Sequence, residues 1–215
     1  MKIIDISWPL SSATTGYKDR EILKFEPRKD FEKDGVRETT ITIDSHSGTH
    51  VDAPIHMLKD GKSIDQISMD SLIGGCIVLD LTDVQEKITR EILAEHDHEI
   101  VENDIVILKT INSATNATDK FTPHFVYLEA SGAAYLAEKR IKAVGIDYLG
   151  IERNQPGHVT HKELFKHDVT IIEGLRLGHV PAGEYFFCCL PLSIPGLEAA
   201  PARAILIAGT FEDEA

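Results

Sequence analysis

Near the end of its first quarter, the sequence reads His46-Ser-Gly-Thr-His50-Val-Asp52-Ala-Pro54-Ile-His56. This stretch follows an alternating, β-branched run at residues 39–44, which is typical of a half-buried strand. Gly48 and Pro54 are incompatible with a continuous helix. The stretch is therefore predicted to form a loop at the end of a strand, with three histidines and one aspartate on it.

The side chains on this loop are of the types that bind transition metals. Imidazole and carboxylate together suit zinc, manganese or iron(II). Gly48 lets the backbone fold so that His46, His50 and Asp52 can converge on one ion. The alternative is a polar loop whose histidines lie close together by chance, and the density of ligand-type side chains favours the metal site.

Outward from this loop, strands and helices alternate, which predicts an α/β fold. The order of these predicted strands and helices favours one domain, residues 1–215, with a mostly β core and no internal repeat. A charged stretch at residues 29–38 is predicted to be a solvated loop or hairpin, and residues 9–19 are rich in turn-forming residues. The predicted strands are residues 3–7, 39–44, 76–81, 104–109, 143–147, 169–173, 185–191 and 202–208; the predicted helices are near residues 89–96 and 128–140.

A second group of chemically active residues lies about a hundred positions later. Thr160 and Glu163 have the spacing of a capping box, which predicts that His161 lies in the first turn of a helix. The positive end of the helix dipole there disfavours protonation and would keep the imidazole free to bind metal. Glu173 ends an apolar run, and a buried carboxylate is costly unless it is paired or coordinated. By spacing alone, a helix-start histidine and a salt-bridged glutamate explain this pair.

The composition of the chain excludes several kinds of binding partner. The chain has 22 basic and 35 acidic side chains, a net charge of −13, so its surface would repel nucleic acid and anionic lipid. An acid and a proline interrupt the N-terminal apolar run, so no secretion signal is expected, and no apolar stretch reaches the ~20 residues of a membrane helix. Cys76, Cys188 and Cys189 have neither disulfide nor zinc-ribbon spacing and are expected to be buried, reduced thiols. A cytoplasmic protein that binds neither nucleic acid nor membrane is predicted.

The eleven-residue stretch resembles the H-x-G-T-H-x-D-x-P-x-H signature of the cyclase family of metal-dependent hydrolases, which includes kynurenine formamidases and isatin hydrolases. The resemblance continues at His161, which is followed twelve residues later by the family's Glu-Gly-Leu at residues 173–175. It covers essentially the whole chain. Shorter matches, weaker individually but in the right order, are Asp5-Ile-Ser7-Trp-Pro9-Leu, Gly183-Glu-Tyr185, Leu190-Pro191-Leu192 and Pro201-Ala-Arg203-Ala.

This resemblance implies a dinuclear centre. His46, His50 and Asp52 would hold one divalent ion, and Asp52 would bridge to a second ion held by His161 and Glu173. The expected ions are two Zn²⁺, with Mn²⁺ as the alternative. His56 is implied to be the catalytic proton-transfer residue. The resemblance also implies a swivelling β/β/α fold, a small-molecule substrate and assembly as a homodimer or homotetramer.

The predicted activity is hydrolysis of an amide C–N bond by metal-activated hydroxide, with arylformamidase activity, N-formylkynurenine to kynurenine and formate, as the leading hypothesis. The alternatives are a lactam, isatin-type or ester hydrolase of the same family, or a metal- or metabolite-binding module without turnover. His56 argues against such a module, which has no use for an acid–base group. The absence of a G-x-S-x-G motif leaves the serine-hydrolase route unsupported.

At two places the sequence departs from the pattern of the family's kynurenine formamidases, so the resemblance does not identify the substrate. The family's kynurenine formamidases usually carry an aromatic-Pro-Gly-Asp-Pro segment that shapes the pocket, whereas this chain has Thr15-Gly-Tyr17-Lys-Asp19-Arg there. Met57 stands after His56, where an aromatic residue is common. His158 has two interpretations: a residue behind the ligands or facing the substrate, or a solvent-exposed loop histidine.

Overall fold

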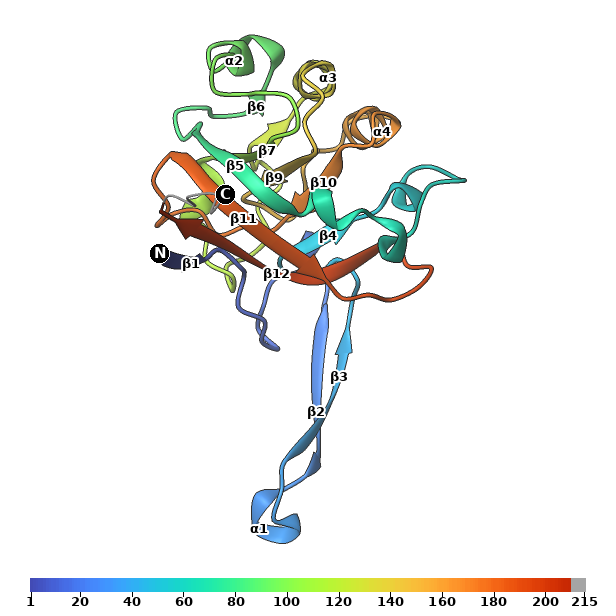
Figure 1. Ribbon diagram of the computed structural model, residues 1–215. Coiled ribbons are helices and arrows are strands. Elements are labelled where there is room, and N and C mark those ends of the chain that lie inside the picture. Colours follow the sequence, from blue (N-terminus) through green and yellow to red (C-terminus); the bar gives the residue numbers. More distant parts are fainter. Residues whose placement is uncertain (210–215) are drawn as a thin grey trace, which may run out of the picture.

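The computed structural model describes residues 1–209, so the last residues of the predicted domain, 210–215, lie outside the described part. Its centre is one large sheet that closes on itself, because the last strand in the order also pairs with the second (Figure 1). The order is β1 (Lys2–Asp5), β12 (Ala199–Ala208), β11 (Gly183–Pro191), β5 (Ile73–Asp80), β7 (Ile105–Lys109), β9 (Ala143–Ile146), β10 (Thr170–Glu173) and β4 (His50–Asp52).

Four neighbouring strands, β5, β7, β9 and β10, are parallel, and helices connect them. The helices α2 (Arg90–Ala94), α3 (Ala130–Glu138) and α4 (Val159–Lys166) lie together on one side of the barrel (Figure 1). Parallel strands covered on both faces require continuous apolar runs, such as Ile105–Lys109. One core cluster lies under the helices, and a second fills the barrel around Val51, Ile107 and Phe187. The predicted α/β fold with a mostly β core is confirmed.

One part of the predicted loop is in fact a strand. His50–Asp52 forms β4, which pairs with β10 so that His50 lies opposite Glu173. The turn before it depends on Gly48, whose φ of 56° is unfavourable for residues with a Cβ. Gly174 packs against this turn so closely that a Cβ would lie 2.2 Å from the Gly48 carbonyl oxygen. This close approach of Gly174 and Gly48 places His50–Asp52 where it can pair with β10.

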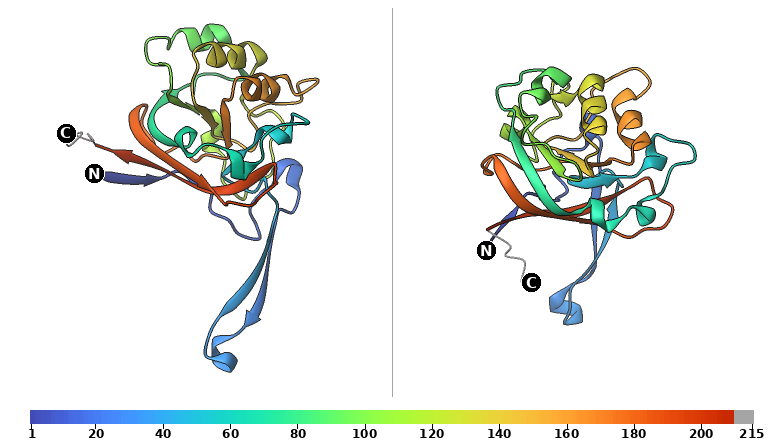
Figure 2. Two further views of the ribbon diagram at one scale, coloured as in Figure 1. Left: turned by 45° about the vertical axis from the view of Figure 1, so that its right-hand side comes forward. Right: turned by 45° about the horizontal axis from the view of Figure 1, so that its top comes forward.

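A hairpin arm projects from the barrel (Figures 1 and 2). It comprises β2 (Leu23–Lys29), the short helix α1 (Phe31–Asp34) and β3 (Glu38–Ile43). The strand predicted at residues 39–44 is therefore present and the stretch at residues 29–38 is the hairpin end, but β2 was not predicted. The prediction that β3 is half-buried is wrong, since all of it except Ile43 is exposed.

Short elements complete the described chain. They are the strands β6 (Lys87–Ile88) and β8 (Tyr127–Leu128) and the 3₁₀ turns η1 (Tyr17–Asp19), η2 (Pro54–His56), η3 (Ile64–Gln66), η4 (Met69–Ser71) and η5 (Ile111–Ala114). Within residues 1–209, no helix has the length and apolarity needed to span a membrane.

Candidate metal centre

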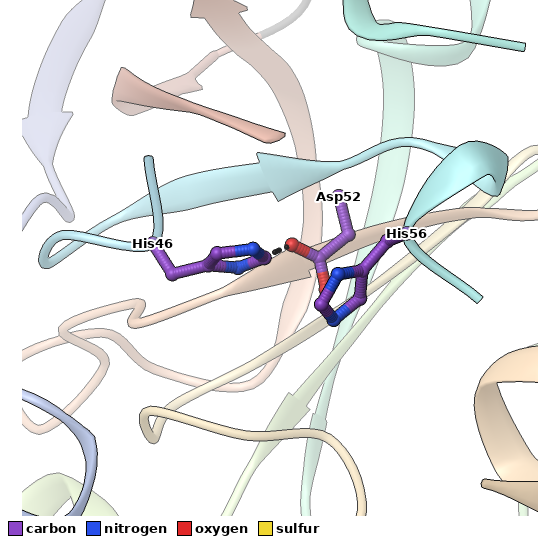
Figure 3. Close-up of side chains that lie close together, drawn as sticks. All are labelled: His46, Asp52 and His56. Atoms are coloured by element: carbon purple, nitrogen blue, oxygen red, sulfur yellow. Dashed lines mark ion pairs between the residues drawn. The ribbon is translucent and has the colours of Figure 1, made fainter. Parts of the chain in front are cut away.

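The residues predicted to bind metal or transfer protons meet at one end of the barrel, although they come from five parts of the fold. His46 lies in the turn before β4, His50 and Asp52 lie on β4, and His56 lies in η2. Figure 3 shows His46 and His56 flanking the Asp52 carboxylate. The remaining two residues, His161 on the first turn of α4 and Glu173 at the end of β10, reach the same point from the helical side.

Asp52 is the central group of this cluster. Its Oδ1 lies 3.0 Å from His46 Nδ1 and 3.4 Å from His50 Nε2, and its Oδ2 lies 3.5 Å from His161 Nε2. Glu173 contacts the same rings, with Oε2 3.4 Å from His50 Nε2 and Oε1 3.5 Å from His161 Nε2. One carboxylate thus faces two histidines with one oxygen and a third histidine with the other.

These atoms fit a divalent cation. Both carboxylate oxygens of Asp52 and Nε2 of His50 are buried without a hydrogen-bond partner, which is costly unless something else satisfies them. Ligands around a tetrahedral zinc ion with bonds of ~2.1 Å lie about 3.4 Å apart, close to the separations found here. Ligand atoms of His50, Asp52 and Glu173 lie within 4.8 Å of one another. A second such group is His46, Asp52 and His56, so His56 also lies within ligand reach.

The charges in the centre depend on one another. Burial disfavours every charged form, but the facing groups outweigh it: Glu173 and Asp52 raise the pKa of His50 to about 9, and Asp52, Glu152 and Glu173 raise that of His161 well above its ordinary value. In turn, the histidines hold the pKa of Asp52 well below its usual range and lower that of Glu173 to about 2. The centre therefore strongly favours bound positive charge, which a divalent ion supplies when it displaces the protons.

The expectation that the helix dipole keeps His161 neutral is therefore wrong for the chain alone, because three nearby carboxylates outweigh it. The capping box is also absent. The residue before the helix is His158, in a left-handed conformation, and Thr160 Oγ1 instead donates to the Leu128 carbonyl oxygen. His161 nevertheless lies in the first turn of α4 and faces the centre.

Two carboxylates near the centre were missed by sequence reasoning. Glu152, in the loop after β9, lies 3.1 Å from His161 Nδ1, and Glu198, just before β12, lies 3.5 Å from His46 Nε2. No motif contains either residue. The only signal for Glu152 is an acidic side chain that follows a long apolar stretch, residues 143–151.

A cavity of about 280 Å³ opens beside the centre and is lined by His46, Asp52, His56, His161 and Glu173. The divergent segment forms another part of its lining through Tyr17, Lys18 and Arg20. Lys18 and Asp19 both have φ of 58°, and Asp19 Oδ1 accepts a hydrogen bond from Phe121 N, which fastens this turn to the barrel. Among residues 1–209, neither Lys18 nor Arg20 forms an ion pair, so two cations without acidic partners stand at the cavity rim, with Lys18 Nζ 5.4 Å from the centroid of the Tyr17 ring.

A closed sheet with a buried centre of histidines and carboxylates defines an α/β protein with a candidate divalent-metal site. Residues 4–153 match the profile of a family described as "Putative cyclase". The chain belongs to this family, as its motifs predicted.

The proteins to which this chain is similar include hydrolases. Kynurenine formamidase of Bacillus anthracis is 30% identical over 207 residues, covering 95% of this chain and 97% of the relative, and that of Salinibacter ruber is 30% identical over 209 residues, covering 96% and 97%. A solved structure described as a potential metal-dependent hydrolase with cyclase activity is 42% identical, with a TM-score of 0.85 over 95% of this chain and 96% of the other. Isatin hydrolase A from Labrenzia aggregata, 22% identical with a TM-score of 0.84 over 97% and 94%, shares the fold. The relationships support a hydrolase of this family and confirm the predicted fold class.

Proposed function

We propose that the protein is a metal-dependent hydrolase of amide C–N bonds and that an aryl formamide, with N-formylkynurenine as the leading candidate, is its substrate. The observation that carries the proposal is the Asp52 carboxylate, buried with both oxygens facing histidines and without hydrogen-bond partners. The similarity of the chain to kynurenine formamidases supports the choice of substrate.

In the proposed site, His46, His50 and Asp52 would hold one ion, and Asp52, His161 and Glu173 a second. Zinc is the expected metal and manganese the alternative. Divalent ions so placed lower the pKa of a coordinated water toward ~7 and polarise a carbonyl. The carboxylates of Asp52 and Glu173 stay ionised, since the surrounding histidines lower the pKa of both.

His56 is proposed to move the proton. Burial lowers its pKa below the ordinary 6.5, so its imidazole is neutral at pH 7 and can accept a proton. During hydrolysis, the water oxygen bonds to the carbonyl carbon and the C–N bond breaks. The proton taken from water passes through His56 to the leaving aryl amine nitrogen.

The two cationic side chains at the cavity rim, Lys18 and Arg20, affect which substrate the cavity would favour. Lys18 and Arg20 lack acidic partners in the described chain, so they favour a substrate with an anionic group away from the scissile bond. N-formylkynurenine carries a carboxylate away from its formamide group, whereas a simple aryl formamide and isatin do not. The pocket thus fits an acidic aryl amide better than an uncharged one.

The expected result is metal-dependent hydrolysis of at least one aryl formamide or lactam. Metal-replete protein is assayed with N-formylkynurenine, isatin, simple aryl esters, and aryl formamides with and without a carboxylate; chelated protein is the control, and elemental analysis gives the metal. Turnover that survives complete metal removal would refute the mechanism. A metal-dependent preference for lactams or esters would refute only the formamide assignment, and no turnover of any substrate would favour a binding module.

We also propose that a second copy of the chain is a partner, as a homodimer. Phe25 and Ile41 are cross-strand neighbours on the arm and are 41% and 56% exposed. An isolated two-stranded hairpin is marginally stable in water. Strand β1 lies on a side of the barrel away from the helices (Figure 1), and within residues 1–209 its Ile3, which lies opposite Ile207, is 60% exposed. Two unpartnered apolar surfaces on one chain suit self-association.

Light scattering coupled to gel filtration should therefore give a dimer mass for the parent protein. A double variant, Phe25→Ser with Ile41→Thr, should shift it toward monomer, because both side chains are exposed in the single chain and would be covered by a partner. Thr40→Ser, on the opposite face of the arm, is the matched control and should stay dimeric. A monomeric parent, or a double variant that dimerises as tightly as the parent, would contradict the proposal.

The cytoplasm is proposed as the compartment. Cys76 and Cys189 are buried, as predicted, while Cys188 is half-buried, and all three are free thiols. Burial raises the pKa of Cys76 to about 12, so this thiol is unreactive.

A further inference from the structure

A buried carboxylate outside the predicted ligand set joins the centre to the cavity wall. Glu152 is 6% exposed. Its Oε2 accepts a hydrogen bond from the backbone N–H of His161 at 3.1 Å and also lies 3.1 Å from Nδ1 of the same residue. Its other oxygen, Oε1, lies 2.8 Å from Nδ1 of His158. One carboxylate thus holds two imidazoles.

The histidines proposed to bind metal share a pattern in how their two ring nitrogens are used. In each ring one nitrogen faces Asp52 and the other faces an acceptor behind it: Gly48 O at 2.9 Å for His50, Glu198 Oε1 at 3.5 Å for His46, and Glu152 Oε2 for His161. An acceptor behind a ligating histidine fixes its tautomer and ring orientation and increases its basicity as a ligand. For His161, Glu152 Oε2 accepts the backbone N–H and lies 3.1 Å from Nδ1 at an ion-pair distance rather than in a hydrogen bond, while Nε2 faces Asp52 and Glu173 at 3.5 Å.

The second imidazole held by Glu152 belongs to the cavity. His158 lines it and has a φ of 53°, a left-handed conformation that is uncommon for residues other than glycine, although histidine adopts it more often than most. Such conformations persist where the surroundings over-determine them, and they cluster at functional sites. The bond to Glu152 holds the ring at the cavity edge, with its Nε2 available to a bound molecule. The side chain of His158 is 58% accessible, as the solvent-exposed interpretation expects, and its ring also lines the cavity, as the substrate-facing one expects.

We propose that Glu152 is a positioning residue that sets two rings at once: His161 for the metal, and His158 for contact with the substrate in the adjoining cavity. The proposal rests on the proposed metal centre and adds a link between metal affinity and substrate binding through one side chain. Glu152 also lines the cavity, but both of its carboxylate oxygens face imidazole nitrogens. Its removal frees both rings, whereas removal of His158 affects only the substrate side.

The test measures zinc affinity by competition with a chromophoric chelator, and kcat and KM with the best substrate. Glu152→Ala should weaken zinc binding by about 10- to 100-fold, the usual cost of losing such an acceptor. Glu152→Gln should lose less, because its amide oxygen can still accept one N–H. His158→Ala should keep parental zinc affinity but raise KM. Glu163→Gln, which removes one charge from α4 away from the cavity lining, is the matched control and should match the parent throughout.

Circular dichroism and thermal unfolding check that each variant is folded, and Glu152→Gln carries the test if the alanine variant is not. Parental zinc affinity in both Glu152 variants would overturn the proposal, as would a loss of zinc in His158→Ala equal to that in Glu152→Ala. A parent that binds no zinc would refute the metal centre itself, so the two failures are distinguishable.

Discussion

Replacing Asp52 with alanine is expected to abolish both metal binding and turnover, the largest effect of any single change in this protein. Asp52 presents one oxygen to His46 and His50 and the other to His161, so its loss removes a ligand from both halves of the proposed centre. Metal ions supply several kcal/mol of transition-state stabilisation, and each 1.36 kcal/mol is tenfold in rate, so kcat/KM should fall by about 10³-fold or more. Elemental analysis and kinetics of the purified variant measure both effects.

Variants of His161 and Glu173, which would hold the second ion, separate the two halves of the proposed centre. His161→Ala and Glu173→Ala should each lose the second ion while keeping part of the first, because His46, His50 and Asp52 remain. Asp168→Asn, at an exposed carboxylate (79% of the side chain accessible), controls for loss of one negative charge. Full parental metal content and activity in both His161→Ala and Glu173→Ala would show that the second half of the centre is assigned wrongly.

The sequence was most informative where a local pattern carries the structure. Continuous apolar runs at β5, β7, β9 and β10 are diagnostic because parallel strands are buried on both faces, and the helices between them follow from the alternation. His161 and Glu173 were joined to the centre only by the family resemblance, because their spacing alone favoured a structural pair, whereas ligand chemistry in residues 46–56 was enough to predict the other half of the centre. These signals depend on short segments and need no knowledge of long-range packing.

What the sequence could not predict depends on contacts between distant segments. β4 is a strand only because β10 and β12, more than a hundred residues away, pair with it on either side. The half-buried assignment of β3 failed because alternation reports an amphipathic strand but not whether anything covers its apolar face. The neutral state expected for His161 failed for a similar reason: Asp52, Glu152 and Glu173 all approach it in the fold, and one helix dipole is worth less than three carboxylates at close range.

The geometry is compatible with two roles for His56, metal ligand and proton shuttle. Its ligand atom lies near those of His46 and Asp52, and its ring lines the cavity. As a proton shuttle, His56→Ala should retain both ions and lower kcat by about 10²- to 10⁴-fold, the usual cost of losing a general acid–base group. Loss of metal in proportion to activity would instead make His56 a ligand. His167→Ala, at a histidine with a half-exposed side chain on the far end of α4, is the matched control.

The pH profile gives this prediction a second readout. Burial lowers the pKa of His56 below the ordinary 6.5, so the neutral, proton-accepting form persists to a lower pH than in a free imidazole. In the parent, the midpoint of the acid limb of kcat/KM should therefore lie below pH 6.5, as His56 becomes protonated. This acid limb should be missing from the residual activity of His56→Ala, since the group that titrates is gone. An identical acid limb in parent and variant would assign the titration to another group and remove His56 from the proton-transfer step.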